Sequence, residues 1–242
     1  MRPLFQHPWR VSYHEATAIQ ESLRARLRLV PFARRIRLVA GADVAYSRRS
    51  HRMYAAVVVV ALPGLEVIET KWVAARARFP YIPGLFSFRE LPPLLAAFRR
   101  LRTTPDALLF DGQGLAHPRR FGLACHAGVL LGRPAVGCAK SILVGEHGPI
   151  GAARGSVADL VCAGETVGAA LRTRAGVKPV YVSPGHLVDL PTSLALVLKA
   201  TGRFRVPEPL RLAHQATTAA MRRLDVGARA PRSHDYPDFI AQ

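Results

Sequence analysis

Hydrophobic positions along the chain follow two patterns, one typical of helices and the other of buried strands. Apolar residues recur every three or four positions along residues 14–29, and this spacing predicts an amphipathic helix. Further helices are predicted at about residues 90–101, 121–131, 192–200 and 208–223. Short continuous apolar runs predict buried strands at residues 37–46, 54–62, 67–75, 107–110, 135–139, 167–172 and 180–182.

The order of these elements predicts an α/β fold with a central mixed β-sheet flanked by helices. The first three strands follow one another through short turns, which indicates an antiparallel meander. Helices and strands then alternate, which implies crossover connections and parallel pairing. Because no repeat or linker divides the sequence, we expect a single domain over residues 1–242, with residues 226–242 as a loose tail.

The charge balance favours a polyanionic partner. The chain has 34 Lys and Arg against 16 Asp and Glu, a formal net charge of +18. Such an excess attracts nucleic acid through phosphate contacts and the release of counterions. A basic tail would be another explanation, but the arginines run from Arg2 to Arg232 rather than forming one block.

The three cysteines, Cys125, Cys138 and Cys162, are widely spaced and form no CxxC pair. This spacing argues against a disulfide framework or a zinc site, so we expect small core residues. The N-terminal residues lack the apolar stretch of a signal peptide, and the most apolar run, residues 53–62, is too short to span a bilayer. We therefore expect a cytoplasmic protein with no membrane partner.

Acidic residues are scarce, so a carboxylate within or at the end of an apolar run needs a partner. Asp43 lies inside a predicted strand and Asp111 directly follows another. On neighbouring strands, the two would offer oxygen ligands to Mg²⁺ or Mn²⁺. The alternative for Asp43 is a structural salt bridge to an arginine. Glu90 is a third candidate ligand, and its alternative is an ordinary first-turn acid stabilised by the helix dipole.

Asp111 opens a segment in which glycines and cations follow a carboxylate at the end of a strand. Gly112 and Gly114 let the backbone approach a bound group. His117 and the two arginines after it add cations beside the carboxylate, as a metal-bound phosphate requires. His117 could polarise a phosphate, contact a base edge or cap a turn. Lys140, after another predicted strand, could contact a phosphate or simply be solvated.

Residues 79–88 form a rigid amphipathic segment. Two prolines bracket Tyr81 and Ile82, and Gly84 permits a sharp bend directly after them. A tip of this kind can wedge between stacked bases and stabilise a flipped one. The alternative is an ordinary aromatic loop packed on the core.

Six segments stand in a distinctive order along the chain. They read GADVAY (41–46), FPYIPGLFSFRE (79–90), DGQGLAHP (111–118), GCAKS (137–141), VSPGH (182–186) and PEPLRLAH (207–214). The blocks cover about residues 10–220, and together they are far more specific than any one alone. In this combination the sequence resembles the endonuclease V family.

The resemblance implies a ribonuclease-H-like fold, which the predicted meander followed by βα units also favours. It further implies a DNA repair endonuclease directed at deoxyinosine and other deaminated bases. Such an enzyme cuts the second phosphodiester bond 3′ to the lesion and leaves 3′-hydroxyl and 5′-phosphate ends. The expected cofactor is Mg²⁺, with Mn²⁺ as a substitute, and the expected chemistry is metal-assisted in-line attack by water.

The resemblance also implies roles for individual residues. Asp43 and Asp111 would be metal ligands, Glu90 would complete the acidic cluster, and His214 would orient or activate water or bind a second ion. Tyr81 would fill the gap left by the extruded base. The other residues expected at the lesion pocket or the neighbouring phosphate are Ile82, Pro83, Gly84, Gly112, His117, Gly122, Lys140 and Leu143.

Two other functions stay open from the sequence. An inosine-specific endoribonuclease of the same fold would carry the same motifs, because they do not separate DNA from RNA. A non-catalytic basic protein of this fold would bind nucleic acid without cutting it, although the set of three acids argues against this. In each case we expect a monomer.

Overall fold

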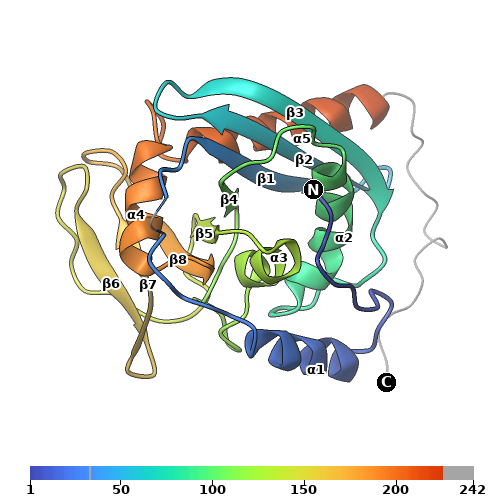
Figure 1. The fold of residues 1–242 in the computed structure, drawn as a ribbon, viewed down its shortest axis with the longest axis horizontal. Coiled ribbons are helices and arrows are strands. Elements are labelled where there is room, and N and C mark those ends of the chain that lie inside the picture. The colour runs from blue at the N-terminus through green and yellow to red at the C-terminus, as the bar shows by residue number, and fades with distance from the viewer. Residues whose placement is uncertain (33, 226–242) are drawn as a thin grey trace.

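A mixed eight-stranded sheet lies at the centre of the molecule, in the strand order β3-β2-β1-β4-β5-β8-β7-β6 (Figure 1). The computed structural model describes residues 1–32 and 34–225, so the predicted tail lies outside the described residues. The strands are β1 (Leu38–Tyr46), β2 (Arg52–Ala61), β3 (Glu66–Arg76), β4 (Ala107–Phe110), β5 (Ala135–Ala139), β6 (Val157–Cys162), β7 (Glu165–Leu171) and β8 (Val180–His186).

The pairing of the strands brings two distant acids to one edge of the sheet. Strands β1, β2 and β3 form the antiparallel meander that the sequence predicts, and β1, β4 and β5 pair in parallel. In the β1–β4 ladder, Ala42 pairs with Phe110. The next residues along these strands, Asp43 and Asp111, therefore occupy neighbouring positions. Strands β8, β7 and β6 complete the sheet in antiparallel order.

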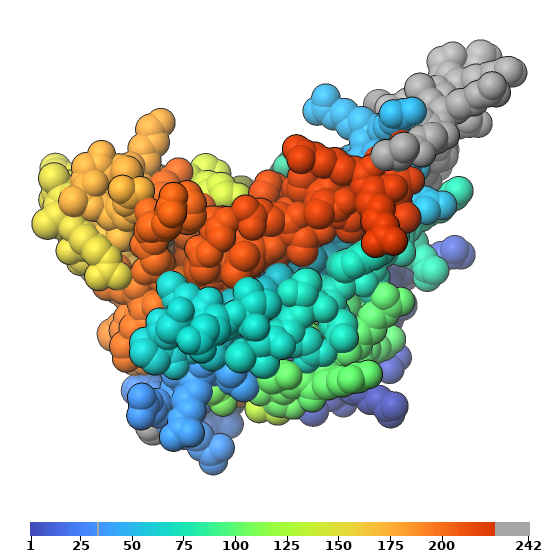
Figure 2. All heavy atoms as spheres, turned by 90° about the horizontal axis from the view of Figure 1, so that it is seen from above, coloured from blue at the N-terminus to red at the C-terminus, as the bar shows by residue number. Residues whose placement is uncertain are grey.

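Helices cover both faces of the sheet, which confirms the predicted fold class. On one face lie α2 (Phe86–Arg99) and α3 (Leu123–Leu131), and α1 (Tyr13–Arg24) contacts α3. On the other face lie α4 (Leu190–Lys199) and α5 (Glu208–Asp225). Figure 2 shows α5 lying along β3 on this side of the molecule.

A close contact between β1 and the start of α5 fixes the position of that helix. A Cβ atom on Gly41 would stand 2.2 Å from the backbone carbonyl carbon of Pro209. Only glycine allows so close an approach of two backbones. Because α5 is seated directly on β1, His214 further along the helix reaches Asp43 on the strand.

Several boundaries differ from the sequence-based prediction. Helix α1 ends at Arg24 because the chain then extends, and the carbonyl oxygen of Arg28 accepts a hydrogen bond of 2.7 Å from the backbone N–H of Leu187. Helix α2 begins at Phe86 rather than at residue 90, since its aromatic first turn is part of the hydrophobic core. Strand β6 has no counterpart among the predicted strands, because only one of its six residues is buried.

The three cysteines are free thiols, as the sequence predicts. Cys125 and Cys138 are buried, whereas Cys162 is partly exposed and is not the core residue expected. None of the helices within residues 1–32 and 34–225 is long and apolar enough to span a bilayer.

Candidate active site

Three carboxylates lie near the carboxyl ends of β1 and β4, close enough for the charges of two of them to act on the third. Asp43 lies on β1, Asp111 directly follows β4, and Glu90 comes from the second turn of α2. Glu90 is 9% exposed. Burial, followed by the charges of Asp43 and Asp111, raises the pKa of Glu90 well above its ordinary value. The first turn of α2 contains no acid, so the alternative of a simple first-turn acid is wrong.

Asp43 is held by α5 rather than by an arginine. Its Oδ2 lies 3.0 Å from Nδ1 of His214 and 3.1 Å from the hydroxyl of Thr217. The His214 side chain is 61% exposed, whereas that of Asp43 is largely buried. The pair therefore offers an accessible imidazole fixed to a shielded carboxylate. Among the described residues, no arginine forms the salt bridge considered for Asp43.

Asp111 forms an ion pair with Lys140, which follows β5. Both side chains are partly exposed to solvent, so this pair lies at the mouth of the site. The alternative of a simply solvated Lys140 is wrong. Because Lys140 lies beside the carboxylate, a phosphate at Asp111 would also meet a positive charge.

The three acids have the donor chemistry of a divalent-cation site. Carboxylate oxygens are the ligands that Mg²⁺ and Mn²⁺ prefer, and a cation would relieve the repulsion felt by Glu90. Within the part of the chain that the structure describes, no three Asp, Glu, His or Cys side chains already stand as a compact ligand set. Each aspartate is paired instead, Asp43 with His214 and Asp111 with Lys140. The chemical type of these side chains, three carboxylates, therefore suits such an ion.

A pocket of about 380 Å³ opens beside Asp111. It lies between the 79–88 segment, the loop after β4 and the chain that follows β5. All the residues that the sequence assigns to lesion binding line it: Tyr81, Ile82, Pro83, Gly84, Gly112, His117, Gly122, Lys140 and Leu143. Tyr81 is 68% exposed, so the alternative of a loop packed on the core is wrong for the tip.

The backbone of Gly84 fixes the base of this tip. Gly84 has φ +78°, a left-handed conformation that favours glycine. Its carbonyl oxygen accepts hydrogen bonds from Nη2 of Arg119 at 2.6 Å, from Nε2 of His117 at 3.0 Å and from Nε2 of Gln20 at 3.1 Å. Three donors on one carbonyl hold the middle of the 79–88 segment in place, directly after Tyr81, Ile82 and Pro83.

His117 is buried and neutral. Its Nδ1 accepts from the backbone N–H of Arg119 at 3.2 Å, so Nε2 carries the hydrogen donated to Gly84. Burial, and then the charge of Arg119, lowers the pKa of His117 to about 4. Of the roles considered from the sequence, the turn contact is the one observed.

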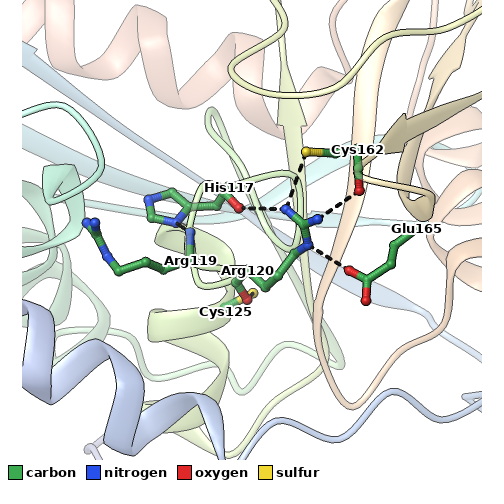
Figure 3. A network of polar contacts seen from close by, with 6 residues as sticks. All are labelled: His117, Arg119, Arg120, Cys125, Cys162 and Glu165. Atoms are coloured by element: carbon green, nitrogen blue, oxygen red, sulfur yellow. Dashed lines mark hydrogen bonds and ion pairs between the residues drawn. The ribbon is translucent and has the colours of Figure 1, made fainter.

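The two arginines after His117 do not turn toward Asp111, contrary to the expected cation cluster. Figure 3 shows their side chains pointing to opposite sides. Arg119 also donates to Oε1 of Gln20 at 2.6 Å. Arg120 donates to the carbonyl of Cys162 at 2.9 Å and to Glu165 at 3.1 Å, and so ties the β6–β7 hairpin to the loop after β4. Lys140 supplies the cation at Asp111 instead.

Comparison with known proteins decides the family. The family model described as Endonuclease V matches residues 21–215. The chain belongs to the endonuclease V family. An endonuclease V from Myxococcus xanthus is 49% identical over 218 residues, which cover 90% of this chain and 92% of that protein.

Solved endonuclease V structures share the fold. The crystal structure of endonuclease V from Streptomyces avermitilis superposes with a TM-score of 0.86 at 40% identity, covering 93% of this chain and 99% of that one. The Ciona intestinalis endonuclease V, at 24% identity and a TM-score of 0.78, covers 87% of this chain and 98% of that one, and supports the fold alone. The fold is therefore the ribonuclease-H-like α/β arrangement that the sequence predicts.

Sequence-based prediction missed Thr217 and Gln20, which hold residues of the candidate site in place. Thr217 contacts Asp43, and its only signal is its position one helical turn after His214. Gln20 holds Gly84 and is 1% exposed. Its signal is a polar residue on the apolar side of α1, which sequence alone does not connect to a segment more than sixty residues away.

Proposed function

We propose that this chain is a DNA repair endonuclease that recognises deaminated bases, chiefly deoxyinosine. It hydrolyses the second phosphodiester bond 3′ to the lesion and leaves 3′-hydroxyl and 5′-phosphate ends. The observation that carries the proposal is that the exposed Tyr81 tip and the acid Asp111 line one pocket. Base recognition and phosphate chemistry can therefore take place on one bound strand.

Lesion recognition is assigned to the pocket and its tip. Tyr81 enters the stack, and the extruded base enters the pocket beside Gly84, Gly112 and Gly122. Hypoxanthine pairs weakly, so its extrusion costs less than that of a normal base. The Ciona protein, which shares this fold, was crystallised with a 24-mer DNA containing an inosine followed by a ribo-adenosine.

We assign phosphodiester hydrolysis to the three acids near the carboxyl ends of β1 and β4. Asp43, Asp111 and Glu90 would hold Mg²⁺ or Mn²⁺, which supplies polarisation of the scissile phosphate and activation of water for in-line attack. Lys140, already beside Asp111, adds positive charge against the phosphate. His214 is oriented through Nδ1 by Asp43, which leaves Nε2 to position the water or accept its proton.

A nicking assay tests the proposal. The substrate is an end-labelled duplex with one deoxyinosine, incubated with and without Mg²⁺, and the cut is mapped to the nucleotide. We expect one metal-dependent cut at the second bond 3′ to the lesion, and none on the matched undamaged duplex. Asp111→Asn serves as the control for contaminating nuclease and should bind the duplex without cutting it.

Two outcomes would contradict the proposal. Binding without cleavage under every divalent metal would favour a non-catalytic protein of this fold. Faster cleavage of a matched inosine-containing RNA would favour the endoribonuclease, because a channel that accepts the 2′-hydroxyl would then be the better fit.

A further inference from the structure

A second concave surface, which we call the α2 groove, lies between helix α2 and the end of strand β3. It has a volume of about 1030 Å³, and none of the described residues that line it carries a carboxylate. Alanines, prolines and Trp9 are among its lining residues. The charged residues among these described lining residues are five arginines: Arg10, Arg76, Arg78, Arg89 and Arg99.

Most of these arginine side chains have no partner among the described residues. Arg89 donates to the carbonyl of Phe79 at 2.9 Å and stacks over Tyr46 at 5.0 Å. Within residues 1–32 and 34–225, the other four are exposed and their side chains make no hydrogen bond or ion pair: Arg10, Arg76, Arg78 and Arg99. Like charges gathered in one groove repel one another, and an anionic ligand removes that repulsion.

The α2 groove starts at the same edge of the sheet as the candidate active site. Strands β1 and β3 both run antiparallel to β2, so their carboxyl ends lie together. Arg76 pairs with Arg52, one position beyond the pairing of Tyr46 with Met53. Arg78 directly precedes the 79–88 segment, and Arg89 directly precedes Glu90. The groove therefore adjoins the start of the 79–88 segment, where Arg89 donates to the carbonyl of Phe79.

The groove then follows α2 to its last residue, Arg99. The residues of α2 that line the groove run from Arg89 to Arg99, a length of about 15 Å at roughly 1.5 Å per residue. Successive phosphates of one DNA strand are about 3.4 Å apart along the duplex axis. This part of α2 therefore matches about five phosphates of one strand.

We propose that the α2 groove binds the sugar-phosphate backbone of the DNA duplex flanking the lesion, over about five nucleotides. The inference rests on the proposed function, because it adds a flank to the substrate placed at the pocket. Arginine contacts to phosphate fix the register of the duplex without reading its sequence. Arg89 is tied to the 79–88 segment through Phe79, so a backbone seated in the groove is aligned with the tip.

The test compares two full-length triple variants with equal loss of charge. The groove variant is Arg76→Gln/Arg78→Gln/Arg99→Gln. The control is Arg34→Gln/Arg35→Gln/Lys199→Gln, whose residues line a separate basic hollow near the start of β1. The dissociation constant for a deoxyinosine duplex of about 30 base pairs is measured against salt for both variants and the wild type, and circular dichroism checks their folding.

The groove variant should lose about 0.9 from the slope of log affinity against log salt for each phosphate contact removed. The control should keep the wild-type slope. At saturating protein, the single-turnover cleavage rate of the groove variant should stay within about threefold of wild type, because its acids are untouched. Shortening the flank that lies in the α2 groove to two base pairs should weaken binding by the wild type. The same shortening should not further weaken binding by the groove variant.

A wild-type slope in the groove variant would overturn the inference, as would an equal loss of slope in the control. If the triple variant misfolds, Arg99→Gln alone is used, with Arg34→Gln as its match. The proposed function fails separately, namely if the wild type cuts no deoxyinosine duplex. The slopes come from binding alone and are read in either case.

Discussion

Substitution of His117 by glutamine tests whether the pocket depends on a neutral imidazole. The wild-type ring donates through Nε2 to Gly84 and accepts through Nδ1 from Arg119. Glutamine keeps a donor at the position of Nε2 but cannot take up a proton. The variant therefore removes the titration of residue 117 while keeping its contact with the segment that carries Tyr81.

The size of the effect follows from the pKa of His117. Burial lowers this pKa to about 4, from about 6.5 in an unfolded chain. Between these values the unfolded state binds a proton that the folded state does not, so stability is full above pH 6.5 and falls as the pH drops toward 4. A difference of about 2.5 pKa units corresponds to about 3.4 kcal/mol, at about 1.36 kcal/mol per unit. His117 is 4% exposed, so screening by solvent is slight.

The assay is urea denaturation at pH 7.5, 6.5, 5.5 and 4.5, with the free energy of unfolding extrapolated to water. At pH 7.5 the variant should be about 1 kcal/mol less stable, because the bond from Arg119 is weakened. Its stability should then fall less steeply, so that the two curves cross between about pH 5 and 6. Substitution of His14 by glutamine, on the exposed side of α1, is the matched control for replacing a histidine away from the pocket. Parallel curves for the wild type and the His117 variant would refute the reasoning.

Three further predictions concern the tip, the seat of α5 and the thiols. Tyr81→Ala should weaken binding of a deoxyinosine duplex by about 5- to 150-fold, the worth of about 1–3 kcal/mol of stacking. An equal loss on undamaged duplex in the same gel-shift titration would remove the wedge argument. Gly41→Ala should lower the free energy of unfolding by about 1–3 kcal/mol and slow nicking, because the new methyl group pushes α5 and His214 away from Asp43. Full nicking activity in this variant would show that the close contact at Gly41 is dispensable. In native protein, a thiol reagent should modify at most one cysteine, Cys162. Burial shields the other two cysteines from the reagent and raises the pKa of both thiols. Rapid modification of all three cysteines would contradict this burial.

Much of the fold could be predicted because its central strands are continuously apolar. The predicted residues 107–110 and 135–139 coincide with β4 and β5, whose residues are all buried. Strand β6 lies at an edge of the sheet and is mostly exposed, so no apolar run marks it. The start of α2 was hidden for a different reason, since Leu85 at its N-cap offers no capping side chain.

The candidate site was predictable where one residue carries the chemistry, and not where residues cooperate. Asp43 and Asp111 stand out as carboxylates in apolar surroundings, and the pocket gathers the residues that the family motifs imply. The contacts of Arg119 and Arg120 depend on tertiary structure, because their partners come from α1 and from the β6–β7 hairpin. Their charge and position in the sequence suggested that both arginines contact phosphate. In the fold, both instead hold neighbouring segments of the protein in place.

The anchored carbonyl of Gly84 has a kinetic consequence. Because the loop that carries Tyr81 is already shaped, the proposed capture of a damaged nucleotide would require no folding of the protein and little loss of its conformational entropy. Under the proposed function, we expect the slow step in finding a lesion to be the spontaneous opening of a base pair in the duplex. Discrimination would then follow from how often each pair opens, and the mispaired nucleotide would be trapped first because it opens most often.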